Sequence, residues 1–299
     1  MIMTTYTLSM RFTVIRKFGQ REKWLLSKRQ LKILKGISTV NEQTDDARKE
    51  EALRALSLFM CPQVMENSAL HAVVGFDDTL TPQFWDMTEG NLLATCKTGV
   101  AMNYMGCTTV LISMLLRFAK EVFQYYLFTD DIAPNYLRND KHCAGNASAL
   151  FDMREVYYST LKKFFNELNY RKALSEAELN KQPFLLVVFG NACRFFADNE
   201  FESFRDLLSL LFRQGKRLRV ACMVMTTRFE SEFLYHRYRE NFSCFVAGST
   251  YPETAKELLQ KDIPDWLIDG RRTDTFLFQN KDNRVQIQTY HLPLGIGLR

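Results

Sequence analysis

The sequence FLLVVF at positions 184–189 is an uninterrupted apolar run that stands between Pro183 and Gly190. Apolar residues at every position, without alternation, are typical of a central strand in a parallel sheet, because helices cover both of its faces. Pro183 and Gly190 mark its two ends, since both residue types interrupt regular structure. The run therefore predicts a parallel strand buried in the middle of a sheet.

Strand and helix patterns alternate on both sides of this run, from Ala69 onward. Further strands are predicted at 72–74, 83–86, 91–95, 123–128, 219–225, 242–248, 275–279 and 285–290, with 83–86 expected to pair with 72–74. Helices are predicted at 107–123, where apolar residues recur at i, i+3 and i+4, and at 156–174, 201–215 and 253–261, with a polar loop at 135–146. This alternation is typical of an α/β layer architecture with a mainly parallel sheet.

Residues 1–60 differ in character and are expected to form a basic N-terminal extension or linker with helices, apart from a domain at 61–299. A strand is expected within 5–15, helices at 21–35 and 47–59, and Pro62 is expected to close the second helix. Between Arg11 and Lys35 nine lysines and arginines face one acid, Glu22. Such a basic stretch suits a nucleic acid, a membrane surface or a solvated helix face, and the solvated face is favoured.

Composition places the chain among ordinary globular proteins, with 46% hydrophobic residues, 24% charged residues and a net charge of +5. The seven cysteines include no C-x-x-C pair, and their odd number suits reduced, buried thiols in a cytosolic compartment. The four histidines lack metal-ligand spacing, so we expect no metal site. The longest apolar stretch of a helix, at 107–116, is about half of the roughly 20 residues that a membrane span needs, and we expect no transmembrane segment.

The loop after the strand at 91–95 lies where an α/β fold binds its ligands. A phosphate-binding loop reads G-x-x-x-x-G-K-[ST], because glycines let backbone N–H groups wrap the phosphates, the lysine neutralises them and the hydroxyl holds magnesium. Cys96 stands at the first glycine of that pattern, Ala101 at the second, Met102 at the lysine and Asn103 at the hydroxyl. Met102 is the gravest change, since a thioether leaves phosphate charge uncompensated. Lys97 is the only nearby lysine that could substitute.

The end of the strand at 184–189 is where the acids of an ATPase should follow. Gly190 and Asn191 stand there instead. A glycine cannot organise magnesium, and an asparagine cannot act as a base toward water. Two separate positions have therefore lost the same chemistry, and we expect ATP binding to be weak or absent.

Several motifs in order along the chain resemble the FtsK/SpoIIIE family of P-loop ATPases, most of all the C-terminal ATPase domains of type VII secretion motors, the EssC and EccC proteins. The matching residues are Val74–Asp78, Pro82, Trp85-Asp86 and Gly90–Leu93 before the loop, then Asp130, Pro183–Phe189, Thr226-Thr227-Arg228, Pro264 and Gly270-Arg271. The resemblance covers about residues 69 to 292. It implies a three-layer, RecA/FtsK-like P-loop NTPase fold.

The resemblance also implies a function. It implies a catalytically inactive domain, a pseudo-ATPase with no catalytic residue, that acts in substrate recognition or motor assembly. Its vestigial nucleotide pocket would consist of Cys96, Lys97, Thr98, Gly99, Ala101, Met102, Asn103, Gly190, Asn191, Thr226 and Arg228. Arg228 suits a sensor or an arginine finger, although a solvent-exposed strand end is the simpler interpretation.

The partners implied are other ATPase domains of the motor and small helical-hairpin secreted substrates, with no nucleic acid. The implied location is the cytoplasm, at the inner face of the membrane, as part of a larger membrane-anchored motor. Two alternatives stay open. One is an active DNA- or protein-translocating ATPase that uses Lys97, and the other is a stand-alone protein-docking scaffold.

Overall fold

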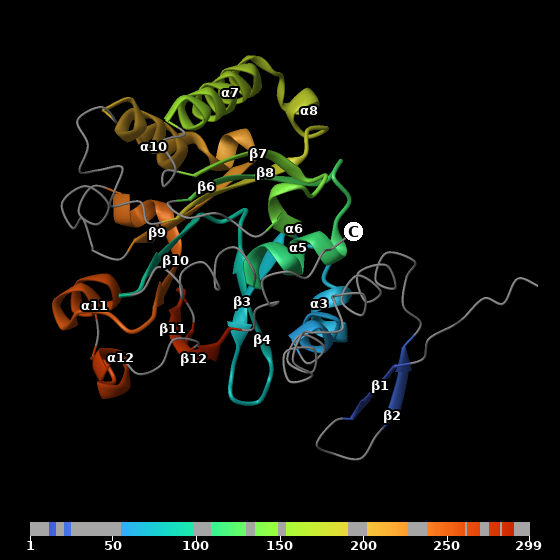
Figure 1. Ribbon diagram of the computed structural model, residues 1–299, viewed down its shortest axis with the longest axis vertical. Coiled ribbons are helices and arrows are strands. Elements are labelled where there is room, and N and C mark those ends of the chain that lie inside the picture. Colours follow the sequence, from blue (N-terminus) through green and yellow to red (C-terminus); the bar gives the residue numbers. More distant parts are fainter. Residues whose placement is uncertain are drawn as a thin grey trace, which may run out of the picture.

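Ten strands form one sheet in the order β4-β3-β12-β11-β10-β5-β9-β8-β6-β7 (Figure 1). The computed structural model describes residues 12–15, 21–24, 55–97, 109–129, 135–148, 154–190, 202–226, 238–260, 262–269, 275–281 and 283–289. The strands are β3 (His71–Phe76), β4 (Pro82–Asp86), β5 (Asn91–Thr95), β6 (Phe123–Thr129), β7 (Cys143–Ser148), β8 (Phe184–Phe189), β9 (Val220–Thr226), β10 (Phe242–Ala247), β11 (Thr275–Gln279) and β12 (Arg284–Gln288).

The six strands from β10 to β7 run parallel to one another, and β8 lies in their middle between β9 and β6. All six residues of β8 are buried, as its sequence predicts. The chain leaves β5 to build the sheet on one side and returns to place β10 on the other. Asn91, at the start of β5, links it to both neighbouring strands. Its side chain accepts a hydrogen bond from Cys222 N of β9 at 2.8 Å and donates one to Asn241 O, just before β10, at 3.0 Å.

The other strands are antiparallel and extend the sheet beyond β10. The pairing of β3 with β4 confirms the one expected from the sequence. Gly75 lets β12 approach β3, because a methyl group there would lie 2.8 Å from Ile287 Cδ1. The sheet is therefore mainly parallel, with an antiparallel wing.

Helices cover both faces of the sheet, and alternate residues of β8 show this directly. Leu186 and Val188 belong to one core cluster, which includes residues of α3 (Pro62–Met65), α5 (Leu111–Arg117) and α6 (Asn135–Arg138). Leu185, Val187 and Phe189 belong to a second cluster with α7 (Arg154–Ala173), α10 (Glu202–Gln214), α11 (Pro252–Leu259) and α12 (Asp265–Asp269). The short helix α8 (Glu176–Leu179) follows α7 in the chain. Because successive strand residues point to opposite faces, the domain has three layers, as expected.

The loop predicted at 135–146 is wrong, because the segment contains α6 and most of β7. β7 is an edge strand made of small and polar residues, CAGNAS, so it lacks the apolar run that marks inner strands. Gly145 brings it close to β6, since a methyl group there would lie 2.8 Å from Tyr126 Cε1. Its place in the sheet depends on that pairing and not on its own composition.

Three helix predictions also need correction. The segment 21–24, expected to be helical, is strand β2 (Arg21–Trp24) and pairs antiparallel with β1 (Phe12–Ile15). The helix predicted at 107–123 ends at Arg117, where Phe118 turns to extended backbone. Residues 55–59 are helical as predicted, but Pro62 begins the next helix instead of closing this one. Proline suits a first helical position because the N–H that it lacks has no partner there.

None of the helices among the described residues combines the length and the apolar character that a bilayer crossing requires.

Candidate functional site

The candidate site lies at the carboxyl edge of the parallel strands, where β5 stands between β9 and β10. The chain passes from one side of β5 to the other, which is the position at which open α/β sheets bind ligands. Four of the predicted pocket residues lie at this edge within the described part of the chain: Cys96, Lys97, Gly190 and Thr226.

Cys96 and Lys97 follow β5 and are tied to both neighbouring strands. Cys96 N donates to Thr226 O at 3.2 Å, and Lys97 N donates to Ser249 O at 2.7 Å. The Cys96 side chain is 2% exposed, and a methyl group at Gly248 would lie 3.0 Å from its sulfur. Cys96 therefore fills space between β5 and β10 at the position where a phosphate-binding loop has its first glycine.

The Lys97 side chain is exposed and lies over an aromatic ring. Its Nζ is 5.1 Å from the ring centroid of Tyr251, which follows β10. A cation–π contact at an exposed site is worth about 0.5–1 kcal/mol. The side chain is thus held on the β10 side of the edge, but only weakly.

Gly190 ends β8, three strands from β10, where an acid was expected in an active enzyme. Its N–H donates to Phe128 O at 2.7 Å, which continues the pairing with β6. A methyl group at Gly190 would lie 3.4 Å from Thr129 Cγ2 and 3.6 Å from Met225 Cε, which are ordinary contact distances. The position can therefore accept a Cβ atom, so crowding at that atom does not explain the glycine.

Thr226 ends β9 and is fully buried between these two groups of residues. The structure thus brings Cys96, Lys97 and Thr226 together and places Gly190 one strand away. Seven predicted pocket residues lie outside the described part of the chain, and their place in the pocket stays a prediction. They are Thr98, Gly99, Ala101, Met102, Asn103, Asn191 and Arg228.

The motif pattern in the sequence did not predict a role for the segment after β10. Ser249 and Tyr251 hold the start of the loop through Lys97, as described above. The hydroxyls of Thr95, Ser249 and Thr250 are buried and have no hydrogen-bond partner within the described residues. The strand at 242–248 was predicted, so the rule that ligands bind after parallel strands was enough to point to these residues.

Among the described residues, this edge carries no carboxylate that could hold magnesium. The described residues at these strand ends are 95–97, 129, 190, 226 and 248–251, and none of them is acidic. Over all of the described residues, no group of three histidine, cysteine, aspartate or glutamate side chains could hold a metal ion. The five described cysteines, Cys61, Cys96, Cys143, Cys222 and Cys244, form no disulfide.

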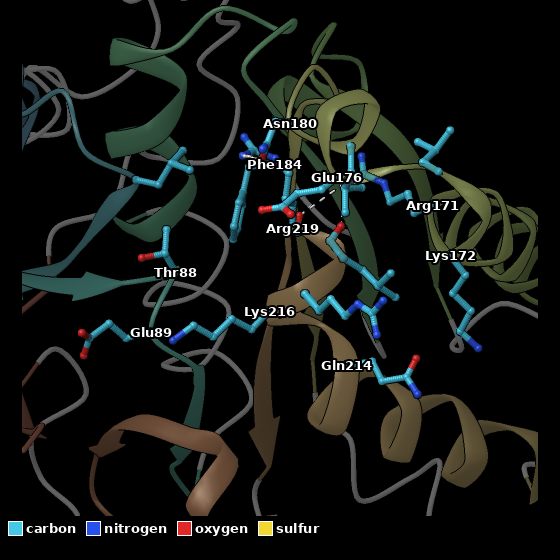
Figure 2. Close-up of a pocket in the computed structure, with 15 residues that line it drawn as sticks. Thr88, Glu89, Arg171, Lys172, Glu176, Asn180, Phe184, Gln214, Lys216 and Arg219 are labelled. Carbon is cyan, nitrogen blue, oxygen red and sulfur yellow. Dashed lines mark hydrogen bonds between the residues drawn. The ribbon is translucent and has the colours of Figure 1, made fainter.

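A cavity of about 690 Å³ lies elsewhere, at the amino-terminal edge of the same strands (Figure 2). Phe184, which begins β8, and Arg219, which precedes β9, are among its lining residues. It is therefore separate from the candidate nucleotide site.

No protein-family model and no curated protein matches the sequence. Solved structures do match, including ATPases 2 and 3 of EccC from Thermomonospora curvata in complex with a signal sequence peptide. This match has a TM-score of 0.59 and 14% identity, and covers 76% of this chain and 41% of the EccC chain. The chain spans less than half of that relative's length.

Two further structures are similar. ATPases 2 and 3 of EssC from Geobacillus thermodenitrificans match with a TM-score of 0.59 and 19% identity over 75% of this chain and 45% of the other. The pCW3 conjugation coupling protein TcpA, in a monomer form with ATPγS, matches with a TM-score of 0.59 and 16% identity over 78% and 69%. Identities this low bear on the fold alone. The chain has the P-loop ATPase fold that the EccC and EssC secretion ATPases share with TcpA.

Proposed function

We propose that the chain is a catalytically inactive FtsK/SpoIIIE-like ATPase domain that acts in substrate recognition or motor assembly in type VII secretion. The observation that carries the proposal is the state of the carboxyl edge. A buried cysteine occupies the first glycine position, and Gly190 stands where the acid of an active site would follow β8. Among the described residues, this edge keeps the fold but includes neither the first glycine of a phosphate-binding loop nor the acid expected after β8.

The backbone at Cys96 and Lys97 supports this proposal. A phosphate-binding loop works by pointing free N–H groups at the phosphates. The N–H groups of Cys96 and Lys97 instead donate hydrogen bonds to the carbonyl oxygens of Thr226 and Ser249, respectively. Neither is available to a nucleotide unless the strand ends separate.

The proposed partners are other ATPase domains of the motor and small helical-hairpin secreted proteins. The EccC match supports this choice, because that protein was solved with a signal sequence peptide. We further propose a location in the cytoplasm, at the inner face of the membrane, without contact to nucleic acid. A stand-alone docking scaffold would share the inactive pocket but not these partners.

A second candidate function is an active translocating ATPase in which Lys97 replaces the missing lysine. The exposed Lys97 side chain favours it, since the one contact of its ammonium group among the described residues is a weak one with Tyr251. The similar structure of TcpA with ATPγS adds a reason to test nucleotide binding directly.

The deciding experiment is a calorimetric titration of the purified chain with magnesium-ATP, together with Met102→Lys and Lys97→Gln. We expect no heat from the unmutated chain at millimolar nucleotide. Micromolar binding that Lys97→Gln abolishes would contradict the proposal and support the active motor. If nucleotide does not bind, a second titration with the C-terminal peptide of a helical-hairpin secreted protein separates recognition from a scaffold, since a scaffold would bind no such peptide.

A further inference from the structure

The cavity at the amino-terminal edge is built by several parts of the fold. The main ones are the C-terminal end of α7, helix α8, the turn at Lys216–Leu218, the first residue of β8 and the turn at Thr88-Glu89 before β5, and Leu70 and Gln214 complete the lining. Its volume of about 690 Å³ is within the range of roughly 300–1,000 Å³ that small-molecule sites occupy. The vestigial nucleotide pocket lies at the other edge of the sheet, so the two sites are independent.

The lining of this cavity is rich in positive charge. Four cationic side chains line it besides the buried Arg171: Lys172, Lys216, Arg217 and Arg219. Arg171 is neutralised by Glu167, with 2.7 Å between Nε and Oε1. Only two carboxylates, Glu89 and Glu176, line the cavity to balance the other four.

These charges do not satisfy one another. Among the described residues, none of the four cations lies within ion-pair distance of a carboxylate. Figure 2 shows Lys216 extending toward Glu89 without reaching it. Lys172, Lys216 and Arg217 are exposed, and Arg219 is half-buried. Like charges gathered around one cavity repel each other, so an anion that binds between them would relieve the repulsion.

Arg219 has two energetically unfavourable features, its backbone conformation and an unsatisfied hydrogen-bond donor. Its backbone has φ 57° and ψ 45°, the left-handed region that glycine and asparagine adopt more readily. Its Nε is buried with no hydrogen-bond partner in the described part of the chain, and its Nη1 reaches Asn180 Oδ1 only at 3.4 Å. A strained residue with an unsatisfied donor at a cavity wall is the kind of feature that ligand sites retain.

We propose that this cavity binds a small multivalent phosphate anion of the pyrophosphate class, with Arg219, Lys216 and Arg217 as its principal ligands. Arginine and lysine together are the usual partners of phosphate oxygens. A ligand with several charges fits four cations that have no ion pair among the described residues, and a cavity larger than one phosphate. Phe184, the one aromatic residue in the lining, is 3% exposed, so no ring face is open to stack on a base. The site therefore suits the phosphate groups themselves.

The test is a titration of the full chain with sodium pyrophosphate at constant ionic strength, in chelator, followed by calorimetry and by the thermal midpoint. We expect saturable binding and a rise in the midpoint. Arg219→Asn removes the charge but keeps a residue that tolerates the left-handed backbone. We expect this variant to bind pyrophosphate about tenfold more weakly, since the loss of one charged hydrogen bond lowers affinity by roughly that factor. The exposed pair Lys216→Gln and Arg217→Gln should weaken binding further without affecting folding.

Two controls locate the site. Lys162→Gln removes an exposed lysine of α7 that does not line the cavity, and Lys97→Gln tests the opposite edge. Both are expected to bind pyrophosphate as the unmutated chain does. Absence of binding, equal binding by the cavity variants, or a loss confined to Lys97→Gln would overturn the proposal. So would binding of an acidic peptide of equal charge in place of pyrophosphate.

Discussion

At the scale of single residues, Cys96 and Gly190 differ in what surrounds them. The Cys96 thiol is packed near Gly248, so a glycine at 96 would leave a small void. A side chain at Gly190 would meet only ordinary contacts with Thr129 and Met225. Gly190 therefore has room for a Cβ atom, while the first loop position is adapted to its cysteine.

This difference leads to a prediction about repair. The variant Cys96→Gly, Ala101→Gly, Met102→Lys and Asn103→Thr is expected to bind more magnesium-ATP but not to hydrolyse it, because Gly190 and Asn191 still supply no acid. Adding Gly190→Asp and Asn191→Glu should raise phosphate release by about a hundredfold or more, the usual contribution of a positioned general base. Gly190→Ala with Asn191→Gln is the matched control. Turnover by the four-residue variant alone would show that the acid comes from elsewhere.

At the scale of elements, Arg171 joins helix α7 to the beginnings of two central strands. Its guanidinium donates to Pro183 O at 2.8 Å, before β8, and to Leu218 O at 3.1 Å, before β9, and is also bonded to Glu167. The side chain is 1% exposed. Burial lowers the pKa of Arg171, while the bond to Glu167 opposes that shift. These hydrogen bonds fix the position of α7 relative to the starts of β8 and β9.

Arg171→Ala is expected to lower the free energy of unfolding by about 3 kcal/mol, because it leaves buried carbonyls without a donor. For a domain of this size that corresponds to a fall of roughly 6–12 °C in the thermal midpoint. Arg171→Lys should recover only part of the loss, since an ammonium cannot span both strand starts as a guanidinium does. Lys162→Ala on the same helix should change the midpoint little. Equal midpoints for Arg171→Ala and Lys162→Ala would show that packing alone fixes α7.

At the scale of the whole molecule, several ionisable groups are buried in their neutral form. Burial raises the pKa of the Cys244 thiol to about 12 and holds the pKa of Cys222 well above its ordinary value. Burial, together with the nearby charge of Glu167, raises the pKa of Tyr126 to about 12. Each group therefore keeps its proton to a higher pH in the folded state than in the unfolded state.

Stability should therefore fall on the alkaline side. The unfolded thiols ionise near pH 9 and the unfolded tyrosine near pH 10, while the folded Cys244 and Tyr126 keep their protons until about pH 12. The stability from these groups is complete below pH 9 and is lost progressively toward pH 12. Urea unfolding at intervals from pH 7 to pH 10.5 measures this loss, and Cys244→Ala should make it shallower. A free energy of unfolding that stays constant over that range would contradict the prediction.

Much of the fold could be predicted because its signals are local. The apolar run at 184–189, the strand at 91–95 and the pair β3–β4 all follow from residues adjacent in the chain. Failures occurred where a segment takes its structure from a distant partner. β7 is small and polar and exists because β6 lies beside it, and β2 is a strand because it pairs with β1.

The same division holds for the sites. The sequence by itself determined that Cys96 and Gly190 follow buried strands, at positions where a P-loop ATPase has a glycine and an acid. Motif positions and strand ends are properties of order along the chain. Only the tertiary structure decided that Ser249 and Tyr251 hold the loop at Lys97, and that Arg219 and Lys216 share a cavity with Lys172 and Glu89. These contacts join residues far apart in the sequence. Their proximity depends on the strand order and on which edge of the sheet each turn reaches, and no local pattern records either.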